Sequence, residues 1–200
     1  MSGLFRHFIL AAVIALSVGP QQAAWAHSDV GVLLMHGKGG TASENSPIGQ
    51  LAAALENAGF IVLAPDMPWH RSRIWDKSFD EAMSEIDTYV EKLKSRGAKN
   101  IIVGGQSLGA NAALGYGARR GRLAGILAIA PGHTPDIRGF QRRMDHDYKR
   151  AAELVANGKG DTFDDFKDFN QGRASDIRAK AAHYLSWYDP EGPAIMPKNA

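Results

Sequence analysis

The chain has 200 residues, of which 44% are hydrophobic and 22% charged, and its formal net charge is +2. This balance is typical of a soluble globular domain with room for one hydrophobic core. There is no cysteine, which excludes disulfides, thiolate metal sites and cysteine nucleophiles. Arginines cluster near positions 119–122 and 138–143, and we interpret both clusters as solvated surface rather than as anion or nucleic-acid patches.

The first 26 residues have the pattern of a secretory signal peptide. Arg6 precedes the apolar run "FILAAVIALSVG", which is too short to span a membrane. Ala24-Trp25-Ala26 then provides an A-x-A cleavage pattern. We predict cleavage after Ala26, with an uncleaved anchor helix as the alternative. The mature protein is then expected to be bacterial, periplasmic or secreted, with no stable membrane anchor.

From position 30 onward, apolar runs alternate with amphipathic segments. Four apolar runs predict strands, at 30–37, 60–66, 100–105 and 125–132, and the first two read as buried. Helices are predicted between them, starting at Ser46-Pro47, at a capping box of Ser78 and Glu81, and at Gly109. Strands that are apolar throughout and separated by helices indicate a parallel sheet buried on both faces. We therefore predict an α/β fold with three layers, α/β/α.

The stretch "GGQSLG" places a serine between glycines where the third strand meets the third helix. Gly105 and Gly109 lie two residues before and after Ser107, in the pattern G-x-S-x-G. The turn is so tight that a side chain at either glycine would collide with the strand or the helix. Ser107 would then have a strained backbone and an exposed hydroxyl. We interpret Ser107 as a nucleophile, the alternative being a glycine-rich turn with an N-capping serine.

The loop "MHGKGG", after the first strand, is a candidate oxyanion hole. Acyl transfer needs two N–H donors for the oxyanion. The Leu108 N–H is one candidate donor. The Lys38 N–H is the candidate for the second donor, and the Gly39 N–H is the alternative to Lys38. A flexible loop and a phosphate-binding loop are the alternatives, although the full G-x-x-x-x-G-K-[ST] pattern is absent. His36 is expected to orient this loop by hydrogen bonding.

Three motifs, in this order, resemble those of the α/β-hydrolase family. "LLMHGKGG" resembles the strand and His-Gly oxyanion loop of the family, and "VGGQSLGA" resembles its nucleophile elbow. "VLAPDMPWHRS" resembles its D-x-P-G-H-G-x-S loop, with Trp69 where glycine is usual and Arg71 in place of the next glycine. The match covers about residues 30–135.

The resemblance implies an α/β-hydrolase fold in which the nucleophile strand lies in the middle of the sheet. The strand order should then be second, first, third, fourth. Ser107 is implied as the nucleophile, with oxyanion donors on Lys38 and Leu108. Asp66 and His70 are implied to brace their loop rather than to join the triad.

The catalytic base and acid are harder to place. In this family both follow the serine, the histidine after a last strand further on. Residues after 132 contain no further apolar strand, so the chain looks C-terminally incomplete, with acid and base expected beyond Ala200. Within the chain, His133 is a candidate base, or else a loop-bracing or substrate-facing residue, and Asp136 is a candidate acid. The weaker candidates are His146, His183 and Asp189.

Residues 137–200 are predicted to be helical. A helix is expected from position 138, a short helix or loop over 161–172, and another helix capped by Ser175. Six aromatic residues in this region either form an apolar lid over the site or pack between ordinary helices: Phe163, Phe166, Phe169, Tyr184, Trp187 and Tyr188.

We therefore divide the chain into a signal peptide (1–26), an α/β-hydrolase core (27–136) and a helical lid-like or C-terminal segment (137–200). The expected function is that of an exported serine hydrolase of carboxylic esters or thioesters. The alternatives are a non-catalytic relative that binds a ligand, or an inactive fragment that lacks the acid and base. The expected partner is a small acyl substrate. No cofactor, metal or nucleic acid is implied, and the oligomeric state stays open.

Overall fold

The computed structural model describes residues 29–200, so the predicted signal peptide lies outside the described residues. The core elements are β1 (Val30–Met35), α1 (Pro47–Asn57), β2 (Ile61–Leu63), α2 (Phe79–Ser95), β3 (Asn100–Gln106), α3 (Leu108–Arg120) and β4 (Gly125–Ile129). They are followed by α4 (Arg138–Ala156), β5 (Phe163–Asn170), β6 (Arg173–Lys180), α5 (Ala181–Tyr188) and α6 (Met196–Asn199). Among these helices, none is long and apolar enough to cross a membrane.

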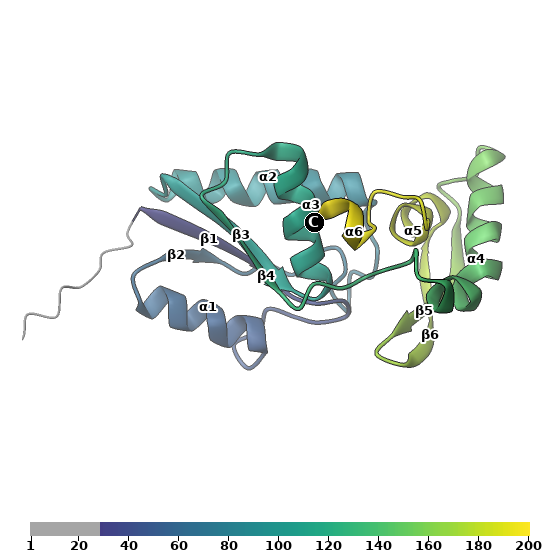
Figure 1. The fold of residues 1–200 in the computed structure, drawn as a ribbon, viewed down its shortest axis with the longest axis horizontal. Coiled ribbons are helices and arrows are strands. Elements are labelled where there is room, and N and C mark those ends of the chain that lie inside the picture. Colours follow the sequence, from purple (N-terminus) through teal and green to yellow (C-terminus); the bar gives the residue numbers. More distant parts are fainter. Residues whose placement is uncertain (1–28) are drawn as a thin grey trace, which may run out of the picture.

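The first four strands form one parallel sheet in the order β2-β1-β3-β4, which confirms the predicted order. Helix α1 covers one face of this sheet, and α2 and α3 cover the other (Figure 1). The predicted three-layer α/β/α architecture is therefore confirmed. Both helix starts predicted from caps are also present: the Ser46 hydroxyl accepts from Gly49 N–H, and Ser78 and Glu81 form a capping box.

Alternating side chains of β1 supply the hydrophobic cores on both faces of the sheet. Val32 and Leu34 pack with the α1 face, whereas Leu33 and Met35 pack with the α2 and α3 face. Because both sets are buried, the strand has to be apolar at every position. The larger core continues from α2 and α3 into the C-terminal segment without a break.

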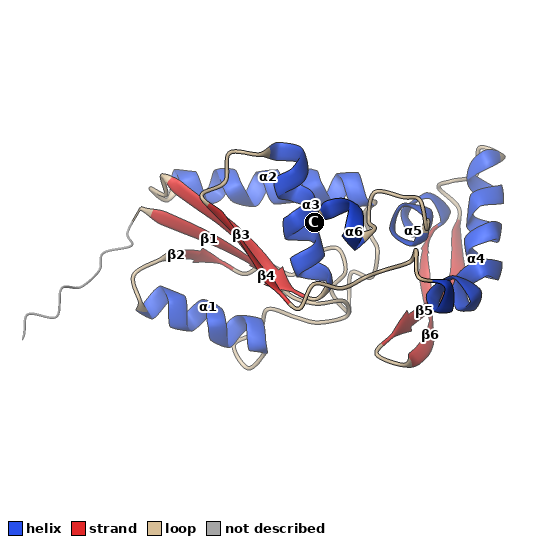
Figure 2. Ribbon diagram, in the orientation of Figure 1, coloured by secondary structure: helices blue, strands red, loops and turns tan. Residues whose placement is uncertain are grey.

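The C-terminal segment lies beyond the carboxyl ends of the sheet strands (Figure 2). Helix α4 begins at Arg138, as predicted. The prediction of a helix or loop over 161–172 and of a helix from Ser175 is wrong. Residues 163–180 form an antiparallel hairpin, β5–β6, and only Ala181–Tyr188 is helical.

Two local features explain why this region is a hairpin. Gln171 and Gly172 both have positive φ, +49° and +82°, which is the backbone of a two-residue hairpin turn. Side chains also alternate in burial, with Phe166 and Asp168 buried and Lys167 between them exposed. This period of two belongs to a strand, and the many charged residues masked it in the sequence.

The aromatic side chains of this segment mostly pack against one another. Phe166 stacks on Tyr184 with ring centroids 4.4 Å apart, and Tyr184 stacks on Tyr188 at 4.2 Å. These three rings and Trp187 are buried, while Phe163 is exposed. Of the two interpretations of these aromatics, packing therefore describes most of them.

Helix α6 ties the C-terminal segment back to the sheet domain. The Asn199 side chain donates to Asn111 Oδ1 of α3 at 3.0 Å and accepts from Arg119 at 2.8 Å. Asn111 in turn donates to the carbonyl of Ala194 at 2.7 Å. The boundary placed at 136/137 thus separates two segments of the chain that share one core.

Strand β4 is an edge strand whose apolar side chains are exposed. Ile126 and Leu127 are 42% and 37% exposed. An apolar, unpaired edge invites pairing with another chain. We expect the 200-residue chain to self-associate and Leu127→Lys to reduce this association, measured by sedimentation velocity. Ile137→Lys, at an exposed apolar residue away from the sheet, is the control, and equal effects of both variants would contradict edge pairing.

Candidate active site

The loops that follow β1, β2 and β3 meet at one edge of the sheet. Trp69, after β2, donates its indole N–H to the carbonyl of His36, after β1, at 2.6 Å. The backbone N–H of Met67 donates to His36 Nε2 at 3.0 Å. Ser107 follows β3 at the same edge. The carboxyl ends of parallel strands are where α/β proteins place their chemistry.

Ser107 lies on a strained strand-to-helix turn. Its φ is +54° and its ψ is −117°, a conformation that L-residues rarely adopt. A Cβ on Gly105 would come within 2.4 Å of the Met35 carbonyl oxygen, and one on Gly109 within 2.3 Å of the same atom. Only glycine fits either position, so the backbone reason for the G-x-S-x-G pattern is present.

The turn is held from the neighbouring strand. Ser107 N–H donates to the Ile129 carbonyl of β4 at 2.9 Å, and the Ser107 carbonyl accepts from Gly132 N–H at 3.2 Å. Across residues 29–200 the Ser107 hydroxyl itself has no hydrogen-bond partner. A Cβ on Gly132 would lie only 3.3 Å from Ser107 Oγ, so the 130–133 loop passes close to this hydroxyl.

Two backbone N–H groups beside Ser107 are available as donors. Within the described residues, neither Lys38 N–H nor Leu108 N–H has a hydrogen-bond acceptor. Gly39 N–H, the other candidate, donates to the Trp69 carbonyl at 2.8 Å and is therefore occupied. Gly37 brings the loop against the elbow, since a Cβ there would lie 3.3 Å from Ser107 Cβ. This arrangement favours Lys38 over Gly39.

His36 orients the loop, as the sequence predicts. Its Nδ1–H donates to the Gly37 carbonyl at 2.8 Å, and its Nε2 accepts from Met67 N–H. Burial lowers the pKa of His36, although the bond to Gly37 acts in the opposite direction. The ring is therefore a neutral brace with both nitrogens engaged, which excludes it as the proton acceptor for Ser107.

Asp66 and His70 lie together in the loop after β2. The Asp66 carboxylate accepts from Ala42 N–H at 3.2 Å and lies 3.5 Å from His70 Nε2. His70 Nδ1 also contacts the Ser72 hydroxyl at 2.8 Å. These contacts agree with the bracing role implied for both residues.

A cavity of about 240 Å³ opens beside Ser107. Its lining combines the loop after β1, the start of α1, the elbow and the tip of the β5–β6 hairpin. The lining residues are His36, Gly37, Lys38, Gly40, Thr41, Ser46, Pro47, Ile48, Gln106, Ser107, Asn170 and Gln171.

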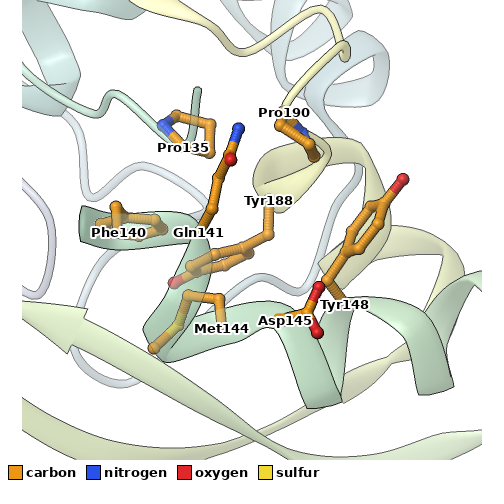
Figure 3. A pocket seen from close by; sticks show the side chains of 8 residues that line it. All are labelled: Pro135, Phe140, Gln141, Met144, Asp145, Tyr148, Tyr188 and Pro190. Atoms are coloured by element: carbon orange, nitrogen blue, oxygen red, sulfur yellow. The ribbon is translucent and has the colours of Figure 1, made fainter. Parts of the chain in front are cut away.

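A second cavity, of about 100 Å³, lies between α4, α5 and the loop before α4 (Figure 3). The rings of Phe140, Tyr148 and Tyr188 form much of its wall, with Gln141 and Asp145 as its polar groups. Ser107 does not line it.

The structure does not join the predicted base and acid to the serine. His133 Nε2 donates to the Trp187 carbonyl at 2.6 Å, and the ring lies among Trp75, Phe140 and Tyr188. In residues 29–200, no hydrogen bond links His133 to Ser107 or Asp136. Asp136 Oδ1 is buried, and the described part of the chain offers it no hydrogen-bond partner.

The weaker candidates are engaged elsewhere. His146 is an exposed residue of α4 beside Asp147. His183 Nδ1 donates to the Trp75 carbonyl at 3.0 Å, and Asp189 accepts from Glu191 N–H at 2.8 Å. The described part of the chain also contains no group of three or more His, Cys, Asp or Glu residues placed to hold a metal ion.

Sequence reasoning missed three residues at the site and gave Tyr188 only as an aromatic of a possible lid or of helix packing. Asp168 and Tyr188 contact or surround the Lys38 side chain, and Asn170 and Gln171 line the cavity beside Ser107. All four belong to β5–β6 or α5. The Asn-Gln-Gly turn and the alternation before it were the available signals for a hairpin.

The pKa of His133 predicts a pH dependence of stability. Burial, reinforced by the charge of Lys38, lowers this pKa from 6.5 to about 4, with the Trp187 hydrogen bond acting in the opposite direction. Between these values the unfolded chain binds the proton more readily. The free energy of unfolding should therefore fall by up to about 3 kcal/mol as the pH drops from about 6.5 to 4.

Urea unfolding at pH 7.5 and pH 4.5 checks this prediction. His133→Asn retains a donor and tolerates the positive φ of 80° at this position, but it does not titrate. The difference in unfolding free energy between the two pH values should shrink in this variant. His146→Asn, at an exposed position, controls for the loss of a histidine, and an unchanged difference in His133→Asn would refute the assignment.

The sheet order and the glycine-flanked turn are those of an α/β-hydrolase fold. Residues 26–176 match the family model described as serine aminopeptidase, S33. This match covers more than half of the chain, so the chain belongs to this family. No match was found among the curated proteins.

Solved structures with the same fold include two hydrolases. The monoacylglycerol lipase of Paleococcus ferrophilus is 22% identical, with a TM-score of 0.53, and the aligned part covers 84% of this chain and 66% of the lipase. The siderophore hydrolase EstB from Aspergillus fumigatus is 17% identical, with a TM-score of 0.50, over 83% of this chain and 59% of that protein. At these identities the likeness shows the fold, and the chain spans less than two thirds of either structure.

Proposed function

We propose that this protein is a serine hydrolase of carboxylic esters or thioesters, with Ser107 as its nucleophile. One observation carries the proposal: within the described part of the chain, the strained serine at φ +54° lies beside two N–H groups without acceptors and borders a cavity. Strain of this kind persists where the surrounding structure enforces it, and it is concentrated at active sites. Membership of a hydrolase family, and the lipase and siderophore hydrolase of the same fold, support an ester or a related acyl compound as substrate.

In the proposed reaction, Ser107 Oγ attacks the acyl carbon and its proton passes to a base. The carbonyl oxygen becomes an oxyanion, which the N–H groups of Lys38 and Leu108 stabilise. The helix that begins at Leu108 directs its positive dipole end to the same place. Collapse of the tetrahedral intermediate expels the alcohol or thiol and leaves an acyl-serine ester, which water then hydrolyses.

His133 is the candidate base among the described residues, and its hydrogen bond to Trp187 decides which ring nitrogen could accept the proton. Its Nε2–H is bound to the Trp187 carbonyl, so Nδ1 is the nitrogen that would accept the proton from Ser107. A base with a pKa of about 4 is neutral at pH 7 but a weak proton acceptor. A serine-dependent rate that titrates near pH 4 would therefore identify His133, with Asp136 as the partner to test next.

A second candidate function is ligand binding without catalysis. The observation that favours it is the engagement of His133 with Trp187 rather than with Ser107. Without a base the serine hydroxyl is a weak nucleophile, although the cavity and donors would still bind a carbonyl compound.

Covalent labelling separates the two functions. A fluorophosphonate probe should form an adduct on the peptide that contains Ser107, detected by mass spectrometry, and Ser107→Ala should abolish it. Ser84→Ala, on the exposed face of α2, is the matched control and should label like the parent protein. No adduct at Ser107, together with retained binding of an acyl ester in calorimetry, would favour the ligand-binding function.

The proposal includes export from the cytoplasm, on the basis of the N-terminal pattern of apolar run and Ala24-Trp25-Ala26. Protein purified from its host should then begin within one or two residues of His27, by N-terminal sequencing. An intact Met1 on membrane-bound protein would contradict this.

A further inference from the structure

The side chain of Lys38 is buried and bound to the distant β5–β6 hairpin. Its Nζ donates to Asp168 Oδ1 at 2.5 Å and to the Phe169 carbonyl at 3.0 Å, across 130 residues of sequence. The side chains of Lys38 and Asp168 are only 10% and 9% exposed. Lysine is rarely buried unless it is paired, and here its partner comes from a distant segment of the chain. The question is what this long-range pairing does for the loop that contains Lys38.

The carboxylate partner is itself fixed from a third element. The Tyr188 hydroxyl of α5 donates to Asp168 Oδ1, and the Tyr188 ring stacks on Tyr184. Burial and the Asp168 charge raise the pKa of Tyr188 well above its usual value, so the hydroxyl keeps its proton. Lys38 Nζ lies 5.6 Å from the centre of the same ring. Asp168 is thus a charged acceptor held between two donors.

The hairpin also contacts the backbone of the same lysine. Asn170 Nδ2 donates to the Lys38 carbonyl at 3.3 Å. The side chain and the carbonyl of Lys38 are therefore both held by β5, while no residue from 29 to 200 accepts from its N–H beside Ser107. Asn170 and Gln171, at the hairpin tip, line the cavity next to that serine.

The loop that carries this N–H needs such support. Gly37, Gly39 and Gly40 surround Lys38, and Gly39 has a φ of +68°. Glycine-rich backbone has many accessible conformations. The Gly37 carbonyl, in the same peptide unit as the Lys38 N–H, accepts from His36 Nδ1–H and Gly40 N–H. The Lys38 side chain fixes the Cα end of that peptide unit. An oxyanion donor contributes only when it is placed before the reaction starts.

We propose that the Lys38 side chain and Asp168 are positioning residues that clamp the Lys38 peptide N–H in the oxyanion hole. Through the clamp, Asp168 of the β5–β6 hairpin supports the oxyanion hole, and this inference rests on the proposed serine hydrolase function. The alternative is an ion pair that merely stabilises the fold.

Four variants of the full chain test the clamp. Lys38→Met and Asp168→Asn each remove one charge but retain the backbone, and Lys38→Met with Asp168→Asn together leaves no unpaired buried charge. Lys167→Met is the matched control, because Lys167 forms an exposed ion pair with Asp176 on the same hairpin. Hydrolysis of p-nitrophenyl acetate, amide hydrogen exchange over residues 36–41 and thermal unfolding are measured for each.

The single and double clamp variants should lower kcat by roughly 10- to 100-fold with KM within about twofold of the parent. Exchange over residues 36–41 should accelerate by about tenfold or more in the same variants, and Lys167→Met should change neither quantity. The double variant should remain folded and still lose kcat, which a merely structural ion pair does not predict.

Two results overturn the clamp: a double variant that folds and retains the parent kcat, or loop exchange that stays at the parent rate in all clamp variants. If the parent protein has no Ser107-dependent rate, the proposed function fails instead. Amide hydrogen exchange over residues 36–41 then still shows whether the hairpin fixes the peptide that contains the Lys38 N–H.

Discussion

In the protein with its base in place, Ser107→Ala is expected to lower the rate of p-nitrophenyl ester hydrolysis by about 10⁴-fold or more. The reason is that the variant removes the atom that forms the acyl intermediate, while the cavity and both donors remain. KM should change little, because the ester still binds. Steady-state kinetics on monodisperse protein provide the measurement.

Stability gives this experiment a second readout. Ser107 has a positive φ that glycine adopts without strain. Ser107→Gly should therefore be as inactive as Ser107→Ala but about 1 kcal/mol more stable, by urea unfolding. A variant at Ser107 that retains the parent rate would show that this serine is not the nucleophile.

Gly109→Ala is expected to destabilise the protein by about 3 kcal/mol or more. The added methyl group would lie 2.3 Å from the Met35 carbonyl oxygen and 2.7 Å from that of His36. Both oxygens are main-chain atoms at the end of β1, so no side chain can rotate to relieve the contact. Either α3 shifts away from the sheet or the elbow loses its shape.

Gly139→Ala is the matched control for this substitution. Gly139 lies in α4, and no atom lies within 4 Å of the added methyl group. Alanine there should stabilise the helix by up to about 1 kcal/mol. Equal stability of Gly109→Ala and the parent protein in urea unfolding would show that the elbow tolerates a side chain, contrary to the structure.

The sheet domain could be predicted because its signals are local. Each strand of the sheet is an apolar run of its own. Each helix cap, at Ser46 and at Ser78, is recognised from residues within about one helical turn of the serine. The elbow is local in the same sense, since Gly105, Ser107 and Gly109 specify one tight turn. The strand order came from the resemblance to a family, and the sheet confirms it.

The hairpin could not be predicted in the same way. Residues 163–180 contain many charges, and the apolar half of their alternation is weak, with Asp168 at a buried position. Asp168 is tolerated there only because Lys38 and Tyr188 donate to it. Neither donor is near it in sequence, so no local pattern marks the site as buried.

The sequence by itself determined the alternation of strands and helices along the chain and the tight turn at Ser107, since short-range sterics and burial patterns decide both. Only the tertiary structure decided which donor beside Ser107 is free and what surrounds His133. It also brought Lys38 to a hairpin 130 residues away. The physical reason is that burial and pairing of charged groups depend on residues far apart in the chain, which meet only when the fold closes.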